Sequence, residues 1–182
     1  MNVKTQTIAR LRDALLESGR RPSAVLSSAY ETLTRAGLLS PEEMAALNRV
    51  EPLTETMFLM MSVDGTVADV ERDAVRGAIR GLTGNVLRTG TINVMLENYA
   101  ERLATQGRDQ RLHEIAEEIA EAPGEAEAAF TLAAAIAYAD DEVDASENEF
   151  INQLADWFGI ESSRAEEILD QLDQDRDSIV SP

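Results

Sequence analysis

The chain of 182 residues is 44% hydrophobic but only 4% aromatic, has no cysteine and carries a net charge of −18. The lack of cysteine excludes disulfides, thiolate metal ligands and cysteine nucleophiles. Residues 1–111 contain 14 basic and 14 acidic residues, whereas residues 112–182 contain 2 and 20, so repulsion by phosphates argues against nucleic-acid binding. Cations or basic protein surfaces remain as ligands, and the alternative is an acidic surface that only maintains solubility.

The N-terminal segment predicts two short amphipathic helices, one before and one after Pro22, because apolar residues recur there every three or four positions. This segment lacks the apolar core of a signal peptide. No run in the chain approaches the roughly 18 apolar residues of a membrane span. We therefore expect a cytoplasmic protein without direct membrane insertion.

A helix start follows, in which Ser40 and Glu43 form a capping box around a proline at the first helical position. This helix is expected to run to about Arg49 and to be interrupted at Pro52. Residues 53–61 (LTETMFLMM) predict a strongly buried helix that leads into an acidic turn.

The rest of the chain predicts more helices with short connections, and hence an all-α multi-helix bundle. Small residues in the alanine-rich helix would let neighbouring helices approach closely, Trp157 would be a core residue, and Ser163 would open a last capping box. The expected helices span residues 69–82, 92–104, 108–121, 125–139, 145–158 and 163–174. The expected organisation is accessory helices at 1–47, one helical domain at 48–174 and a flexible tail at 175–182.

The acidic turn occurs twice. Residues 63–71 (VDGTVADVE) reappear as residues 139–147 (ADDEVDASE), 76 positions later. The same offset matches Val75 with Ile151, on the helix behind each turn. The sequence therefore predicts an internal pseudo-repeat of helix, acidic turn and helix.

One interpretation of the turns is structural. Asp144 and Glu147 have the spacing of a capping box. Their negative charge near the positive end of the helix dipole would stabilise the helix by about 0.3–1 kcal/mol. Gly65 supplies a positive φ, and Val67 and Val143 would be buried staples between paired helices. This interpretation explains Glu and Val but does not explain the first Asp of each turn.

Asp64 and Asp140 lie at the end of the preceding helix, where the dipole disfavours a carboxylate. A Ca²⁺ or Mg²⁺ ion, an arginine from elsewhere or a hydrogen bond to the backbone would each offset that cost. An EF-hand loop does not fit, since its sixth and twelfth positions would be Ala145 and Ile151. The candidate ligands for a divalent cation are Asp64, Glu71, Asp140, Glu142, Asp144 and Glu147.

These motifs resemble the TerB-like domain of tellurite-resistance proteins, which also occurs at the N-terminus of certain membrane-anchored co-chaperones. The resemblance rests on residues 62–67 with Glu71 and on residues 139–144 with Glu147, and it covers about residues 48–174. It implies an all-helical cytoplasmic protein, divalent-cation binding by the acidic turns, and association with stress-response proteins, some at the inner membrane.

Two positions depart from the family pattern. Ala68 occupies an N-cap position where Ser, Thr or Asp is expected, and Asp141 replaces the glycine of the second turn. Residues 1–47 lie outside the resemblance. The alternative is therefore a purely structural scaffold or adaptor without a metal site, and the two hypotheses differ in cation dependence.

No catalytic constellation is evident, so we expect no enzyme and no cofactor other than the cation. His113 is the only histidine, and no serine lies in a Gly-x-Ser-x-Gly elbow. Arg72, Arg76 and Arg80 form a basic stripe, which is either a solvated face or a surface that docks the acidic half of a second copy in a homodimer.

Overall fold

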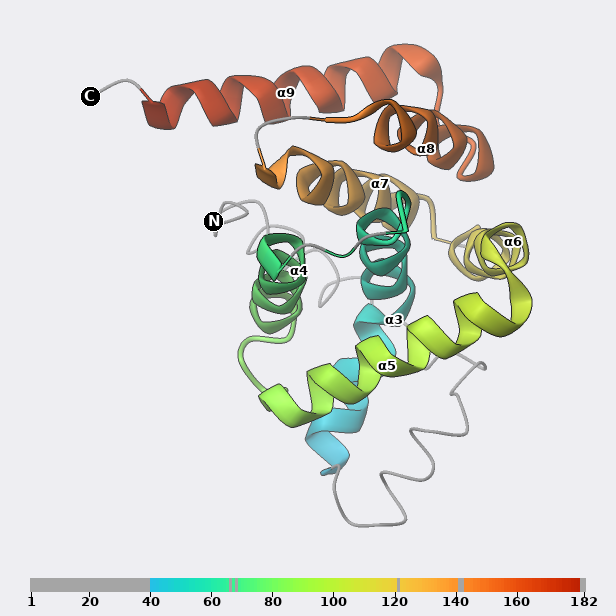
Figure 1. Cartoon of the computed structure of the whole chain (residues 1–182), viewed down its shortest axis with the longest axis vertical. Coiled ribbons are helices and arrows are strands. Elements are labelled where there is room, and N and C mark those ends of the chain that lie inside the picture. The colour runs from blue at the N-terminus through green and yellow to red at the C-terminus, as the bar shows by residue number, and fades with distance from the viewer. Residues whose placement is uncertain (1–39, 66, 68, 121, 141–142, 181–182) are drawn as a thin grey trace.

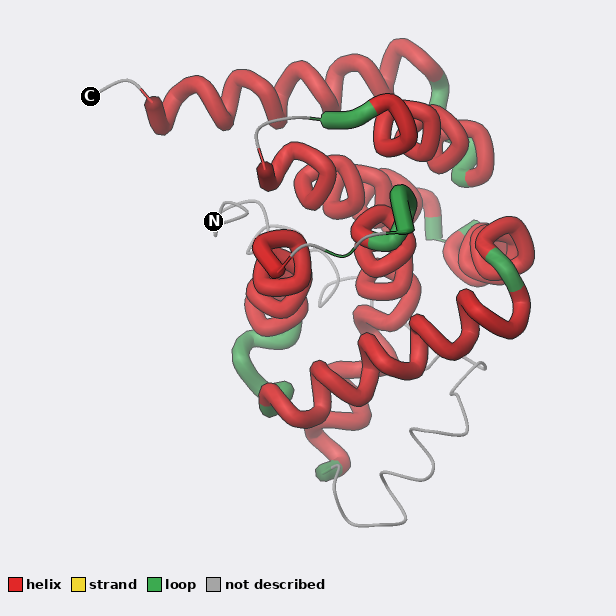
Figure 2. Tube along the Cα trace, in the orientation of Figure 1, coloured by secondary structure: helices red, strands yellow, loops and turns green. Residues whose placement is uncertain are grey.

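The computed structural model describes residues 40–180, apart from residues 66, 68, 121, 141 and 142, and this part of the chain is all-α, as predicted (Figure 1). Figure 2 shows helices joined by short loops, without strands, in the described residues. No helix among them is both long and apolar enough to cross a membrane. The helices are α3 (Pro41–Met61), α4 (Asp69–Leu82), α5 (Thr89–Gln106), α6 (Arg108–Ile119), α7 (Pro123–Ala137), α8 (Ala145–Trp157) and α9 (Ser162–Val180), with a 3₁₀ turn η1 (Tyr138–Asp140).

Helix α3 is the centre of the bundle. Every residue from 50 to 61 is buried, so this half of the helix has neighbours on all sides. It packs most extensively against α7 and also contacts α4, α5 and α6 (Figure 1). Helices α4, α5, α6 and α7 therefore surround the buried helix α3. Helices α8 and α9 form an outer layer over α7.

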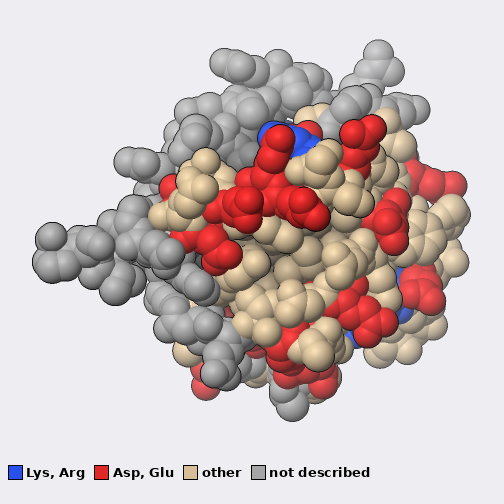
Figure 3. All heavy atoms as spheres, turned by 90° about the horizontal axis from the view of Figure 1, so that it is seen from above, with Lys and Arg blue, Asp and Glu red and all other residues tan. Residues whose placement is uncertain are grey.

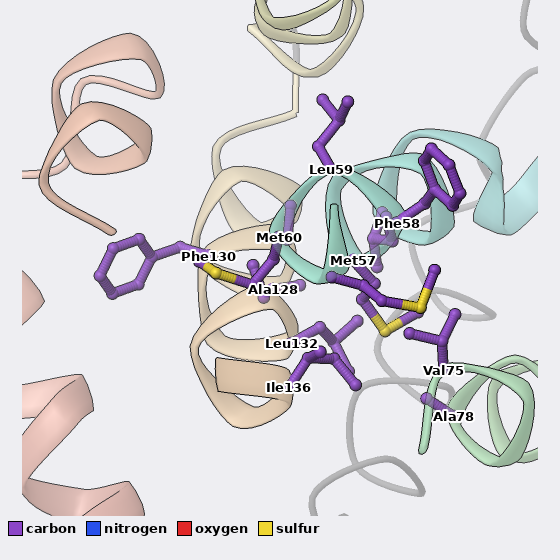
Figure 4. Packing of buried hydrophobic residues seen from close by; sticks show 14 of the residues in the cluster. Met57, Phe58, Leu59, Met60, Val75, Ala78, Ala128, Phe130, Leu132 and Ile136 are labelled. Atoms are coloured by element: carbon purple, nitrogen blue, oxygen red, sulfur yellow. The ribbon is translucent and has the colours of Figure 1, made fainter. Parts of the chain in front are cut away.

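Helix α7 carries a row of small buried side chains. Ala129, Ala133 and Ala137 recur at four-residue spacing and are all fully buried. Figure 4 shows Met57 and Met60 of α3 in a core region that includes Ala128 and Leu132 of α7 and Val75 of α4. Because alanine leaves room for the larger side chains of neighbouring helices, it favours close packing of α7, and α7 makes the most extensive contact with α3.

The interruption expected at Pro52 is wrong, since α3 continues through it. Proline lacks an N–H and costs a helix interior about 3 kcal/mol relative to alanine. Residues on both sides are buried, among them Leu47, Val50 and Leu53. Their burial offsets the local cost, because packing supplies most of the stability of helices in proteins. The domain boundary expected at residue 47 thus falls inside a continuous helix.

The other helices lie within a few residues of their expected positions, except at the C-terminus. Helix α9 reaches Val180, past the expected end at residue 174, and Leu169 and Leu172 of α9 pack against the core. Ser163 lies inside α9, so the capping box expected there is wrong. The two helices expected before residue 40 lie outside the described residues. The accessory helices expected at residues 1–47 therefore remain a prediction for all but the last few positions of that range.

The start of α3 confirms the first predicted capping box. The backbone N–H of Ser40 donates to Glu43 Oε2 at 2.9 Å, and the Glu43 N–H donates to Ser40 Oγ at 3.2 Å. The same carboxylate accepts from Arg88 Nε at 2.8 Å, which ties the start of α3 to the loop before α5. The hydrogen bond from Arg88 lowers the pKa of Glu43 despite its burial.

Ala133→Leu should destabilise the protein by about 1–3 kcal/mol, because the added methylene groups overpack the core around the fully buried Ala133 of α7. Ala104→Leu, on the exposed part of α5, is the matched control and should change stability by no more than about 0.5 kcal/mol. Urea unfolding followed by circular dichroism measures both. Equal midpoints for the two variants would contradict close packing around Ala133.

Candidate functional site

The first acidic turn connects α3 to α4. Gly65 has φ = 81°, which confirms the expected positive φ, and Val67 packs against the core. Asp64 is exposed, whereas Glu71, in the first turn of α4, is buried. These two predicted ligands therefore lie in different environments, one in solvent and one against the bundle.

An arginine lies at the end of α3, where the sequence left a cation, an arginine or a hydrogen bond to the backbone as alternatives. Arg108 Nη2 donates to the Val63 carbonyl at 3.0 Å, and its guanidinium lies 5.3 Å from the centre of the Phe150 ring. Its positive charge at a helix C-terminus is favourable. Arg108 thus joins the first turn to α6 and α8.

The second acidic turn forms the capping box that the sequence predicts. The N–H of Asp144 donates to Glu147 Oε2, and the N–H of Glu147 donates to Asp144 Oδ1, both at 2.8 Å. The bond from the Glu147 backbone, with another from Ser146, lowers the pKa of Asp144. Val143 packs against the core like its counterpart Val67. Asp144 itself is exposed and Glu147 is buried.

Among the described residues, no group of three or more acidic or histidine side chains is placed to hold a metal ion. That set does not include Glu142, nor the side chain of Asp140. Two of the predicted ligands of the second turn are thus outside the described part, and the cation remains a prediction. The pseudo-repeat also remains one, although Val75 and Ile151 are both buried, as it would require.

A buried ionic network joins three helices, and sequence reasoning did not find it. Glu55 of α3 accepts two hydrogen bonds from Arg111 of α6, from Nε at 2.7 Å and from Nη2 at 2.9 Å. Arg102 of α5 donates to Glu55 at 3.1 Å and to Glu51 at 3.1 Å. Arg111 also pairs with Glu114 in its own helix.

The two glutamates of this network differ in how well they are compensated. The pKa of Glu51 is raised to about 7, chiefly by burial and to a lesser extent by the negative charges of Glu118 and Glu55, although Arg102 lowers it. Removing one partner of a buried ion pair typically costs about 3–5 kcal/mol. The signal in the sequence was two glutamates four residues apart within an apolar stretch, which places both on one helix face.

The basic stripe of α4 is largely occupied by local partners. Arg76 donates to Asn93 at 3.0 Å and to Asp73 at 3.2 Å, and Arg80 donates to Thr89 at 2.9 Å. These bonds tie α4 to α5 and favour the interpretation of the stripe as a local, solvated face.

A groove lies where the ends of α6, α7, α8 and α9 meet. It has a volume of about 570 Å³, and its lining is apolar at Ile119, Ala126, Phe158 and Ile160 and charged at Glu127, Glu161 and Arg164. Trp157 lines it as well and is 40% exposed, so its expected place in the core is wrong. The last residue of a helix can face solvent even when its neighbours are buried, and periodicity is a weak guide there.

The outer face over α8 and α9 is acidic (Figure 3). Arg164 is the single Lys or Arg between residues 112 and 175. It donates to Glu127 at 3.1 and 2.9 Å and to Glu167 at 2.9 Å, so acidic groups already surround its charge. Up to residue 175, the exposed acidic residues of these two helices are Glu149, Asp156, Glu166, Glu167 and Asp170.

Glu51→Gln should remove a pH dependence of stability. The pKa of Glu51 is about 7 in the folded chain and 4.5 at its usual value, which applies to the unfolded chain. Between these two pH values, folded Glu51 retains a proton that the unfolded chain has released. The free energy of unfolding of the wild type therefore falls across this range, by about 3 kcal/mol. Urea unfolding at several pH values should show the variant gaining on the wild type by this amount.

Glu97→Gln, at an exposed position of α5, is the control and should follow the wild type at every pH. A constant difference between Glu51→Gln and the wild type from about pH 5 to pH 8 would contradict the raised pKa of Glu51.

The family model of Tellurite resistance protein TerB matches residues 51–170. Comparison with curated proteins and with solved structures gives no significant match. The matched region contains both acidic turns, the buried ionic network and the groove, and it makes up well over half of the 182 residues. The chain therefore belongs to the TerB family.

Proposed function

We propose that this TerB-family chain is a cytoplasmic, non-enzymatic domain of a tellurite-related stress response, and that it acts by binding other proteins. The acidic outer face of α8 and α9 carries this proposal. Among the side chains that the structure describes there, one arginine, Arg164, lies with the exposed carboxylates, and it is held by Glu127 and Glu167. Such a face attracts basic surfaces over long distances and repels acidic ones.

The proposal of a non-catalytic role rests on how the charged side chains are used. Glu55 and Arg111 bind each other in the interior, and Asp144 and Glu147 cap a helix. His113 is exposed and lies 3.4 Å from Glu117 on the same helix, a local pair on the surface. These roles are structural, and none positions a nucleophile beside a base.

Loss of the gene should increase sensitivity to tellurite in the organism that carries it, and the wild-type chain should restore growth. A variant with Glu149→Gln, Glu166→Gln and Asp170→Asn should fail to restore it, because it removes three exposed charges from the acidic face. The measurement is the inhibitory concentration of tellurite, which should fall at least about fourfold with the triple variant. For a partner at constant concentration, a fourfold weaker binding constant corresponds to about 0.8 kcal/mol.

The matched control removes three exposed acidic charges from α5 and α6 by Glu97→Gln, Glu101→Gln and Asp109→Asn, and it should restore growth fully. Unchanged sensitivity after gene loss would contradict the link to tellurite. Restoration by both triple variants would contradict a role for the acidic face.

A divalent cation at the second acidic turn is the second candidate function. The exposure of Asp144 and its lowered pKa favour this turn, because an ionised carboxylate in solvent reach suits Ca²⁺ or Mg²⁺. Asp140 and Glu142 are close to it in sequence and would supply further oxygens. The first turn is less suitable, since Glu71 is buried while Asp64 is exposed. The alternative is that both turns only cap and orient helices.

Asp144→Asn separates these two interpretations. Asparagine caps a helix as well as aspartate does, so the variant keeps the cap and loses only the charge of a ligand. If the turn binds a cation, Ca²⁺ or Mg²⁺ added to the chelator-treated wild type should raise the thermal midpoint. At a hundredfold excess of free cation over Kd, the free energy of unfolding should increase by about 2.7 kcal/mol.

Asp144→Asn should lose this rise, and Glu97→Gln on α5 should retain it. If neither ion stabilises the wild type, or if all three proteins respond equally, the second turn is a structural cap without a metal.

A further inference from the structure

The groove between α6, α7, α8 and α9 leaves apolar surface without a partner. Trp157 is 40% exposed at its edge, although large apolar side chains elsewhere in the described residues are mostly buried. The ring of His113 lies beside it, with centroids 5.9 Å apart. Tryptophan buries a large area when it is covered, and for this reason it is enriched among the residues that dominate binding energy at protein interfaces.

The rim of the groove is negatively charged. Glu127 and Glu161 line it, and Asp156 is exposed next to Trp157 in sequence. Arg164 also lines the groove, but it donates to Glu127 and to Glu167, so two carboxylates already surround its charge. An occupant that brings positive charge to this rim would gain electrostatic energy, and an anionic one would be repelled.

The acidic surface continues beyond the groove. Glu149, Glu166 and Asp170 are exposed along α8 and α9, and Figure 3 shows acidic side chains spread over this face. A small cationic molecule in the groove would contact only the rim. A segment of protein several helical turns long would place one or two apolar side chains in the groove and its basic residues against the face.

We propose that this groove binds a cationic amphipathic helical segment of a partner protein, with an apolar anchor over Trp157 and Lys or Arg residues against Glu161 and the acidic face. This inference rests on the proposed function of the domain, which acts through protein partners. It adds where the partner binds and what chemistry the partner presents.

Trp157 is the only tryptophan of the chain and reports directly on the groove. The probe is a synthetic amphipathic peptide of roughly 14 residues, about four helical turns, made of Leu, Ala and Lys. Its titration into the full chain should shift the emission of Trp157 to shorter wavelength, saturate, and protect the indole from acrylamide. The same peptide with Glu in place of Lys should produce no shift, and high salt should weaken the Lys peptide.

Glu161→Lys should weaken binding of the Lys peptide at least about tenfold, which corresponds to 1.4 kcal/mol. Glu97→Lys makes the same charge change on α5, away from the groove, and should bind like the wild type. Circular dichroism and the thermal midpoint check that each variant is folded. If Glu161→Lys does not fold, Asp156→Lys takes its place at the exposed position beside Trp157.

The proposal is overturned if the Lys peptide leaves the emission of Trp157 unchanged, if the Glu peptide shifts it equally, or if the groove variant and Glu97→Lys bind alike. The tellurite experiment separates this failure from that of the proposed function. Growth lost with the triple variant of the acidic face, together with no peptide binding, would keep the function and reject the groove.

Discussion

The burial of α3 is the constraint on which the rest of the structure depends. A helix with neighbours on all sides cannot leave Glu51 and Glu55 uncompensated, because a buried charge without a partner costs several kcal/mol. Arg102 of α5 and Arg111 of α6 supply the positive charges that pair with these glutamates. Since both arginines reach Glu55, α5 and α6 are fixed relative to α3 by directional bonds, whereas α7 is held by the packing of buried apolar side chains.

Local features could be predicted from the sequence because their physics is local. A capping box joins residues three positions apart, so Ser40 with Glu43 and Asp144 with Glu147 were readable without a fold. The positive φ of Gly65 follows from the short turn in which it lies. The all-α class follows in the same way from apolar residues at helical spacing.

Features that depend on distant parts of the chain could not be predicted. Nothing near Glu55 in sequence indicates Arg111, which lies 56 residues away. The continuation of α3 through Pro52 depends on packing by other helices, which overrides local propensity. Trp157 is the last residue of α8, where helical periodicity does not decide exposure. The candidate site could therefore be predicted only in part. The sequence predicted its helix cap, but it did not predict the arginine at Val63, the ionic network or the groove.

The course of α3 has a consequence for dividing this protein into parts. The family match starts at residue 51, in the middle of a helix that begins at Pro41. A fragment cut at that position would lose Ser40 and Glu43, and with them the cap of α3 and its link to Arg88. It would also lose Ala46, Leu47 and Val50 from the core. A fragment of this protein that keeps the whole of α3 should therefore begin no later than Ser40, upstream of the first matched residue.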